Sequence, residues 1–101
     1  MPEIGMKEGA FVPCPDSPNC VSSMASDTAH YIEPIATAGL EREEAFARMQ
    51  EILAASRGCT IITAEDFYIH AEFRSKLFRF VDDVECYFPG DEQLIHIRSA
   101  S

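Results

Sequence analysis

The chain is short of basic residues and has no long apolar run, and each shortage excludes a class of partner. Only eight Lys and Arg accompany 17 Asp and Glu, which gives a formal net charge of −9. A charge of this sign repels phosphate backbones and anionic lipid headgroups, so we expect no nucleic-acid partner. The sequence contains no run of roughly 18 apolar residues, so we also expect no insertion into a membrane.

Glycine is also scarce, and the missing glycine motifs exclude two kinds of active site. The five glycines are all separated in the sequence, so no glycine-rich loop is available to hold a phosphate group. The chain also lacks the Gly-x-Ser-x-Gly motif with which many hydrolases present a serine nucleophile. We therefore expect no cofactor.

An export signal is missing as well, because residues 1–8 are too polar for a basic segment followed by an apolar one. On this ground we expect a cytoplasmic location.

The four cysteines are compatible with two disulfides in an oxidising compartment or with four thiols in the cytosol, and the residues alone leave both states open.

With 101 residues, the chain has room for one domain with a single modest core. Residues 1–29 contain prolines, serines and little apolar periodicity, so we expect an irregular N-terminal segment there. Residues 30–101 carry the periodic patterns and form the predicted core of the domain.

The patterns in the second part predict an α+β fold. Apolar residues recur at helical spacing over residues 40–57, and Gly58 is the expected stop of this helix. A short strand is expected around 31–35, and alternating patterns predict further strands at 59–64, 67–75, 78–88 and 94–99. Because the links between the later strands are short, they form an antiparallel meander. The predicted fold is an antiparallel sheet of four to five strands with one main helix packed on one face, a two-layer sandwich.

The strand over residues 67–74 has a polar face and an apolar face. The polar face carries four side chains: Tyr68, His70, Glu72 and Arg74. We favour an ordinary solvated face of an antiparallel sheet. The alternative is a row of groups that lines a groove, with His70 as acid or base. Strand pairing would bring His96 near this row, but no ligand spacing indicates a metal, so we predict none.

Asp82 conflicts with the apolar pattern of the next strand. It shares its parity with Val84, Cys86 and Phe88, which mark the core face. Either the strand bulges near this residue or Asp82 is a buried carboxylate with partners. The candidate partners are Arg74, Arg79, Arg98 and the backbone amides and hydroxyls of residues 14–23. We favour an inward Asp82 that acts as a structural latch, with Asp83 exposed.

The cysteine loop, residues 14–20, has the sequence Cys-Pro-Asp-Ser-Pro-Asn-Cys. Its two prolines and short polar side chains predict a compact, rigid turn structure. Cys14 and Cys20 lack the spacing of thioredoxin-like or zinc-ribbon sites, so a disulfide or a pair of packed thiols is favoured over redox chemistry. Cys59 and Cys86 lie in apolar strands and are expected to be small core residues.

Four motifs together resemble a known family. They are Cys-Pro-x-Ser-Pro-Asn-Cys-Val-Ser-Ser at 14–23, His-Tyr-Ile-x-Pro-Ile at 30–35, residues 71–75 continuing into Phe-Val-Asp-Asp at 80–83, and Ile-Arg-Ser-Ala-Ser at 97–101. From about Val12 onward the chain resembles the bacterial and plastid proteins of the domain-of-unknown-function family 1499, which has no established activity.

This resemblance implies two further expectations. Some members of the family are set in the cell envelope or the thylakoid lumen, which is the alternative to a cytoplasmic location and would favour oxidised cysteines. Members usually continue past the last motif with a segment containing Gly, Asp and Arg. We therefore expect a truncated or short form here, in which any groove that this segment closes is open.

Two functions agree with the sequence. The first is a non-enzymatic binding or interaction module for an unknown protein or small molecule, with a surface formed by the cysteine loop and the polar side chains. The candidate binding residues are His70, Arg74, Asp82, Asp83 and Arg98. The alternative is a small hydrolase-like enzyme in which His70 is the base and Asp82 or Asp83 orients it.

Overall fold

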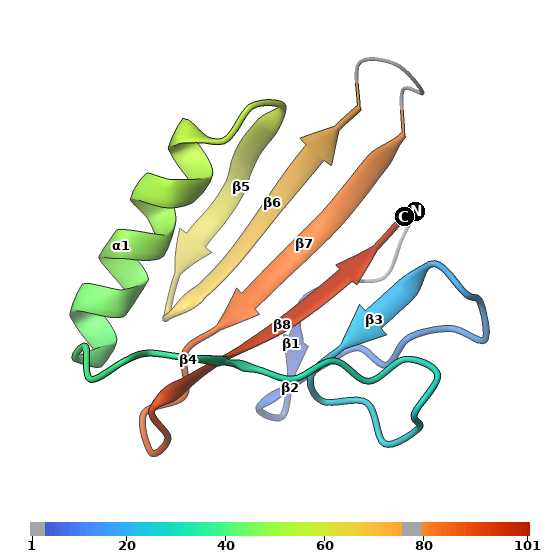
Figure 1. Ribbon diagram of the computed structural model, residues 1–101, viewed down its shortest axis with the longest axis horizontal. Helices are drawn as coiled ribbons and strands as arrows, with labels where there is room; N and C mark the ends of the chain where they lie inside the picture. Colours follow the sequence, from blue (N-terminus) through green and yellow to red (C-terminus); the bar gives the residue numbers. More distant parts are fainter. Residues whose placement is uncertain (1–3, 76–79) are drawn as a thin grey trace.

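The computed structural model describes residues 4–75 and 80–101, which form a mostly antiparallel sheet with one helix on one face (Figure 1). The main sheet has six strands, in the order β3-β8-β7-β6-β5, with β4 also paired to β8. These strands are β3 (Cys20–Ser22), β4 (Ile35–Ala36), β5 (Cys59–Glu65), β6 (Tyr68–Arg74), β7 (Val81–Tyr87) and β8 (Leu94–Ala100). A separate two-stranded sheet pairs β1 (Met6–Lys7) with β2 (Ala10–Phe11). The predicted α+β class is confirmed, but the prediction of four to five strands was too low.

The four long strands form the predicted antiparallel meander, since β5, β6, β7 and β8 pair consecutively. The register between β6 and β7 is continuous from the Arg74 and Val81 pair to the Tyr68 and Tyr87 pair. A register shift occurs instead in β5, between Ile61 and Thr63. The beginning of the predicted strand 78–88 and part of the link before it lie outside the described residues.

Helix α1 spans Arg42–Ala55, two residues shorter at each end than predicted. Glu43 and Glu44 in its first turn interact favourably with the positive end of the helix dipole. Gly58 follows the helix with a φ of 79°, and a Cβ atom there would lie 2.7 Å from the carbonyl oxygen of Arg74. Glycine is therefore required at this position both for its backbone conformation and for the close approach of β6.

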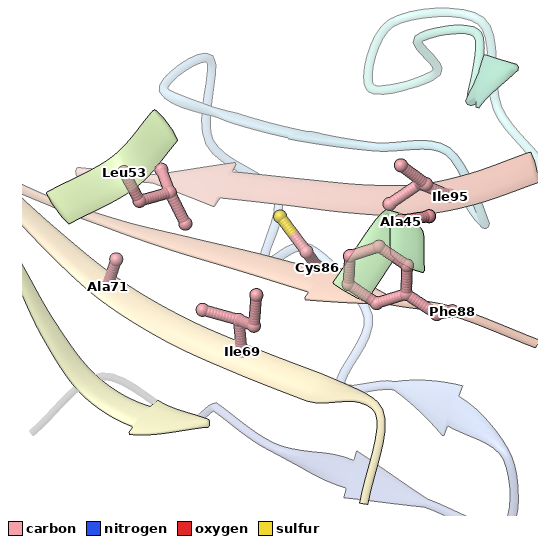
Figure 2. Packing of buried hydrophobic residues seen from close by; sticks show 7 residues of the cluster. All are labelled: Ala45, Leu53, Ile69, Ala71, Cys86, Phe88 and Ile95. Carbon is pink, nitrogen blue, oxygen red and sulfur yellow. The ribbon is translucent and has the colours of Figure 1, made fainter. Parts of the chain in front are cut away.

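The hydrophobic core lies between α1 and the sheet (Figure 2). Ala45 and Leu53 of the helix face the apolar side chains of three strands. The remaining members of the cluster are Ile69, Ala71, Cys86, Phe88 and Ile95. Cys86 is thus a small core residue, as predicted, and burial raises its pKa to about 12.

The N-terminal segment contributes strands that the sequence did not predict. β3 pairs with β8 in the register Cys20 to Ala100, so a segment near the start of the chain extends the sheet beyond β8. Cys14 and Cys20 form a disulfide with their Cα atoms 5.7 Å apart. The β1–β2 hairpin lies behind the sheet, on the face opposite α1 (Figure 1).

Candidate functional site

The sheet face opposite α1 carries a row of ionisable side chains. His70, Glu85 and Arg98 are direct register partners across β6, β7 and β8. Their apolar neighbours Ile69 and Cys86 belong to the core, and side chains alternate along a strand, so these three project from the opposite face. All three are buried.

Glu85 is the centre of this row and has no exposed surface. Its Oε1 accepts a hydrogen bond of 3.1 Å from Nη1 of Arg98, which is itself buried. Its Oε2 accepts bonds from the Tyr68 hydroxyl, at 2.7 Å, and from the backbone N–H of Gly5, at 2.8 Å. The buried carboxylate therefore has three donors, which is the condition under which such a charge is tolerated inside a protein.

Tyr68 is held in this cluster as a hydrogen-bond donor. Burial, followed by its bond to Glu85, raises the pKa of the hydroxyl well above its ordinary value. Tyr68 therefore keeps its proton at all physiological pH values, and the bond to Glu85 fixes the position of the ring.

His70 and Asp83 form a second buried pair. The Nε2 atom of His70 lies 2.8 Å from Oδ1 of Asp83, and the exposed fractions of the two residues are 6% and 7%. The pair borders an open groove of about 730 Å³, which we call the His70 groove. Its lining residues are Ile4, His70, Glu72, Arg74, Val81, Asp83 and Ser101.

A short N-terminal strap, residues 4–11, covers part of this polar face. Its Gly5 N–H bonds to Glu85, and Phe11 is buried with its N–H 3.4 Å from the Met24 sulfur. The interpretation as a solvated face is therefore wrong for His70, which is buried, whereas Arg74 at the end of the row is exposed as expected. The alternation was read correctly, but a segment without periodicity lies over it.

The buried aspartate is Asp83 and not Asp82, which corrects the predicted latch. β7 pairs on both sides without a bulge, so Asp82 keeps the parity of the core face. The fully buried part of that face begins further along, at Cys86, and Asp82 remains partly exposed with its carboxylate bonded to the Ser101 hydroxyl. Asp83 projects onto the strap-covered face, where His70 is its partner. Arg79, a candidate partner of Asp82, lies outside the described residues.

The predicted binding residues are thus divided among three places. His70, Arg74 and Asp83 line the same groove. Arg98 does not line it and instead forms the buried ion pair with Glu85. Asp82 is on the other face. His96 is not near the polar row of β6, because β7 lies between the two strands; its Nδ1 atom is 2.8 Å from the Ser23 hydroxyl.

Glu85 is the residue that sequence reasoning missed. A glutamate between valine and cysteine is normally expected at the surface. The available signal was the register of the meander, which aligns Glu85 with His70 on one side and Arg98 on the other, a favourable cross-strand arrangement of charges.

Among the described residues we find neither a group of metal ligands nor a helix that could span a membrane. Within residues 4–75 and 80–101, no group of three His, Cys, Asp or Glu side chains is placed to hold a metal ion. The only described helix, α1, is too short and too polar to cross a bilayer.

Comparison with known proteins identifies a family but no activity. The family whose model matches residues 10–101 is described as a protein of unknown function, DUF1499. No curated protein and no solved structure matches the chain.

Proposed function

The chain belongs to the DUF1499 family, and we propose that it is a non-enzymatic binding module, one domain that holds a small ligand in the His70 groove. The observation that carries this proposal is the combination of a groove of about 730 Å³ with a buried His70–Asp83 pair beside it. A fixed polar pair next to an open groove can orient a ligand without moving when the ligand binds.

The charges of the groove favour a ligand with both signs of charge. Arg74 and Glu72 form an ion pair of 3.4 Å, with 65% and 28% of their side chains exposed. Such a pair contributes little to stability, so a ligand can replace either partner at low cost. A carboxylate would bind Arg74, and an ammonium group would bind Glu72 and the Oδ2 atom of Asp83.

The apolar residues of the groove restrict the rest of the ligand. Ile4 and Val81 also line the groove. Apolar side chains favour an aliphatic portion on the ligand, because its burial removes apolar surface from water. A free aliphatic amino acid, which combines a carboxylate, an ammonium group and a branched side chain, fits this set of contacts.

The test is a ¹⁵N NMR titration with L-leucine and two analogues that each lack one charge. Leucinamide lacks the carboxylate and 4-methylpentanoate lacks the ammonium group. We expect leucine to bind about threefold more tightly than either analogue, because a contact with a partly exposed charged partner is worth up to about 1 kcal/mol. Arg74→Gln should remove most of the preference for leucine over leucinamide.

The control for this variant is Arg48→Gln, which removes the same charge from an exposed position on α1. It should leave leucine binding unchanged. Equal affinities for leucine and both analogues would contradict the proposed recognition of both charges. Shifts confined to residues away from the groove would contradict its location.

The His70–Asp83 pair also favours a second candidate, a small hydrolase. With Nε2–H donated to Asp83, the Nδ1 atom of His70 would be free to act as a general base on water. The same samples separate the two functions, because a hydrolase would convert leucinamide into leucine and ammonia over time, and His70→Ala would abolish the conversion. A binding module leaves leucinamide intact.

A further inference from the structure

A second pocket lies on the polar face, and it is chemically different from the His70 groove. Its volume is about 370 Å³. It is lined by residues of the strap, β5, the β5–β6 turn, β6 and β7: Met6, Gly9, Thr63, Glu65, Asp66, Tyr68 and Tyr87. None of these residues lines the groove, so the two pockets can be occupied independently.

Two tyrosines form one side of this pocket. Tyr68 and Tyr87 are direct register partners on β6 and β7, which places both side chains on the polar face, where both line the pocket. The bond from the Tyr68 hydroxyl to Glu85 holds the first ring in place. Aromatic rings attract cations electrostatically through their faces.

Two carboxylates add negative charge at the rim. Glu65 and Asp66 both line the pocket and both are exposed. Neither takes part in an ion pair with any residue that the structure describes. The pocket therefore has uncompensated negative charge, in a protein whose net charge is already −9.

The strap supplies a third kind of contact. Gly5 is bonded to Glu85, and the next residue, Met6, lines the pocket. A methionine side chain is polarisable and packs well against methyl groups. Glu85 thus fixes the position of Tyr68 from one direction and of the strap from the other.

We propose that this pocket binds a small free cation that carries a quaternary ammonium group. The methyl groups of such a cation pack against the tyrosines and Met6, and its charge is balanced by Glu65 and Asp66. A primary amine fits less well, because it is strongly hydrated and needs hydrogen-bond acceptors on all sides.

The test is a ¹⁵N NMR titration with choline at constant ionic strength, in parallel with 3,3-dimethyl-1-butanol. The second compound has the shape of choline with carbon in place of the charged nitrogen. We expect saturable shifts at Tyr68, Tyr87 and Glu65, and at least about tenfold weaker binding of the neutral compound. Equal binding of the two compounds, or no saturable shift with choline, would overturn the proposal.

Variants separate the aromatic contribution from the charge. Tyr87→Leu keeps an apolar side chain but removes the ring, and should weaken choline binding about tenfold. Glu65→Gln should weaken it about threefold while leaving the fold intact, since this residue is exposed. The matched control is Glu51→Gln, which removes one charge from an exposed position on α1. Unchanged affinity in both pocket variants would overturn the proposal.

Two further arms define the source of the cation and the independence of the site. Phosphocholine carries a phosphate group, which would lie near the negative charges of Glu65 and Asp66, so phosphocholine should bind more weakly than choline. Tighter binding of phosphocholine would indicate a lipid headgroup as the ligand and would overturn the assignment to a free cation. His70→Ala should leave choline binding unchanged, because His70 is not in this pocket. Loss of choline binding in that variant would also contradict the proposed site.

Discussion

At the scale of single residues, Glu85 has the largest expected effect on stability. Glu85→Ala would leave the Arg98 guanidinium buried without its partner and would free Gly5 and Tyr68. We expect the free energy of unfolding to fall by about 3–5 kcal/mol, the range for breaking a buried ion pair. Urea melts of the variant and the wild type measure this difference.

The control for Glu85 is a double replacement. Glu85→Leu together with Arg98→Met removes both charges and keeps apolar volume, so it should be less destabilising than Glu85→Ala alone. If the double variant were as unstable as the single one, the cost would come from lost packing and not from an unpaired charge.

Asp82 and Asp83 are adjacent residues in very different surroundings. Asp83→Ala should lower the free energy of unfolding by about 2 kcal/mol, because it leaves the buried His70 ring without its partner. Asp82→Ala removes only a bond to the exposed Ser101 hydroxyl and should cost about 0.5 kcal/mol. Urea melts decide the order, and a larger effect at Asp82 would contradict the observed parity.

The sequence indicates part of this site and not the rest, for a physical reason. Alternation along one strand places His70 and Arg74 on the same face, and these two do line one groove. Alternation cannot show which charged side chains are paired across neighbouring strands, because this depends on the register of the strands. Asp83 and Glu85 were therefore misplaced or missed, although both lie in a strand whose existence was predicted.

At the scale of elements, the β5–β6 turn stores backbone strain. Asp66 and Phe67 both have positive φ, 53° and 59°, which is unfavourable for any residue with a Cβ atom. The Phe67 ring is held by Phe46, with centroids 5.2 Å apart, and by the Arg42 guanidinium carbon, 3.8 Å above it. Packing on the helix side therefore stabilises a turn that the residue types alone do not favour.

This strain predicts an unusual order of stability for two variants of Phe67. Phe67→Ala and Phe67→Gly both lose the ring contacts, but only the alanine keeps the penalty for positive φ. We expect the glycine variant to be more stable by about 1 kcal/mol, whereas glycine is normally the worse choice within an element. Thermal melts of the two variants give the comparison, and an alanine variant of equal or greater stability would rule out strain at this position.

The cysteine loop is joined to the segment before β4 by His30. Its two ring nitrogens lie 2.6 Å from an Asp27 carboxylate oxygen and 2.7 Å from the Ser17 carbonyl oxygen. Both partners can only accept, so both nitrogens must carry protons. The bond to the Ser17 carbonyl, and then the bond to Asp27, raise the pKa of His30, and His30 lowers the pKa of Asp27.

The pH dependence follows from the direction of the two shifts. The contribution of His30 to stability is fully present below its ordinary pKa of 6.5 and is lost as the pH rises through its higher folded value. The contribution of Asp27 is present above 3.8 and is lost on acidification. Wild type should therefore lose more stability than His30→Ala between pH 6 and pH 9 in urea melts. Parallel pH profiles would show that this contact is absent in solution.

The elements themselves were predicted unevenly. The meander of β5 to β8 follows from long alternating runs with short links, and α1 follows from its helical period. The short strand expected around 31–35 corresponds to β4, which is displaced to Ile35–Ala36, whereas β3 is three residues long and was not predicted, because it is too short for any period to show. Their place is set by pairing with β8, which is distant in the sequence and leaves no local pattern.

At the scale of the whole molecule, the disulfide fixes the segment that leads into β3. The two cysteines are six positions apart, so closing this small loop should stabilise the protein by about 2 kcal/mol. Cys14→Ser with Cys20→Ser should lower the free energy of unfolding by that amount in urea melts.

Alkylation followed by mass spectrometry tests the Cys14–Cys20 disulfide independently. Denatured but unreduced protein should take two labels, on Cys59 and Cys86, and reduced protein should take four. Four labels without reductant would show that Cys14 and Cys20 are thiols in the purified protein.

β8 joins regions from both halves of the sequence, and this has a consequence for how the chain folds during synthesis. Its partners are β7 on one side and, on the other, β3 and β4, which precede it by more than fifty residues. A ribosome must therefore release residues 94–100 before β3 and β4 can pair with β8. Until then the backbone groups of β3 and β4 that bond to β8 remain in water, and closing such long loops is slow. We expect the cysteine loop to be held in place only after β8 has been made.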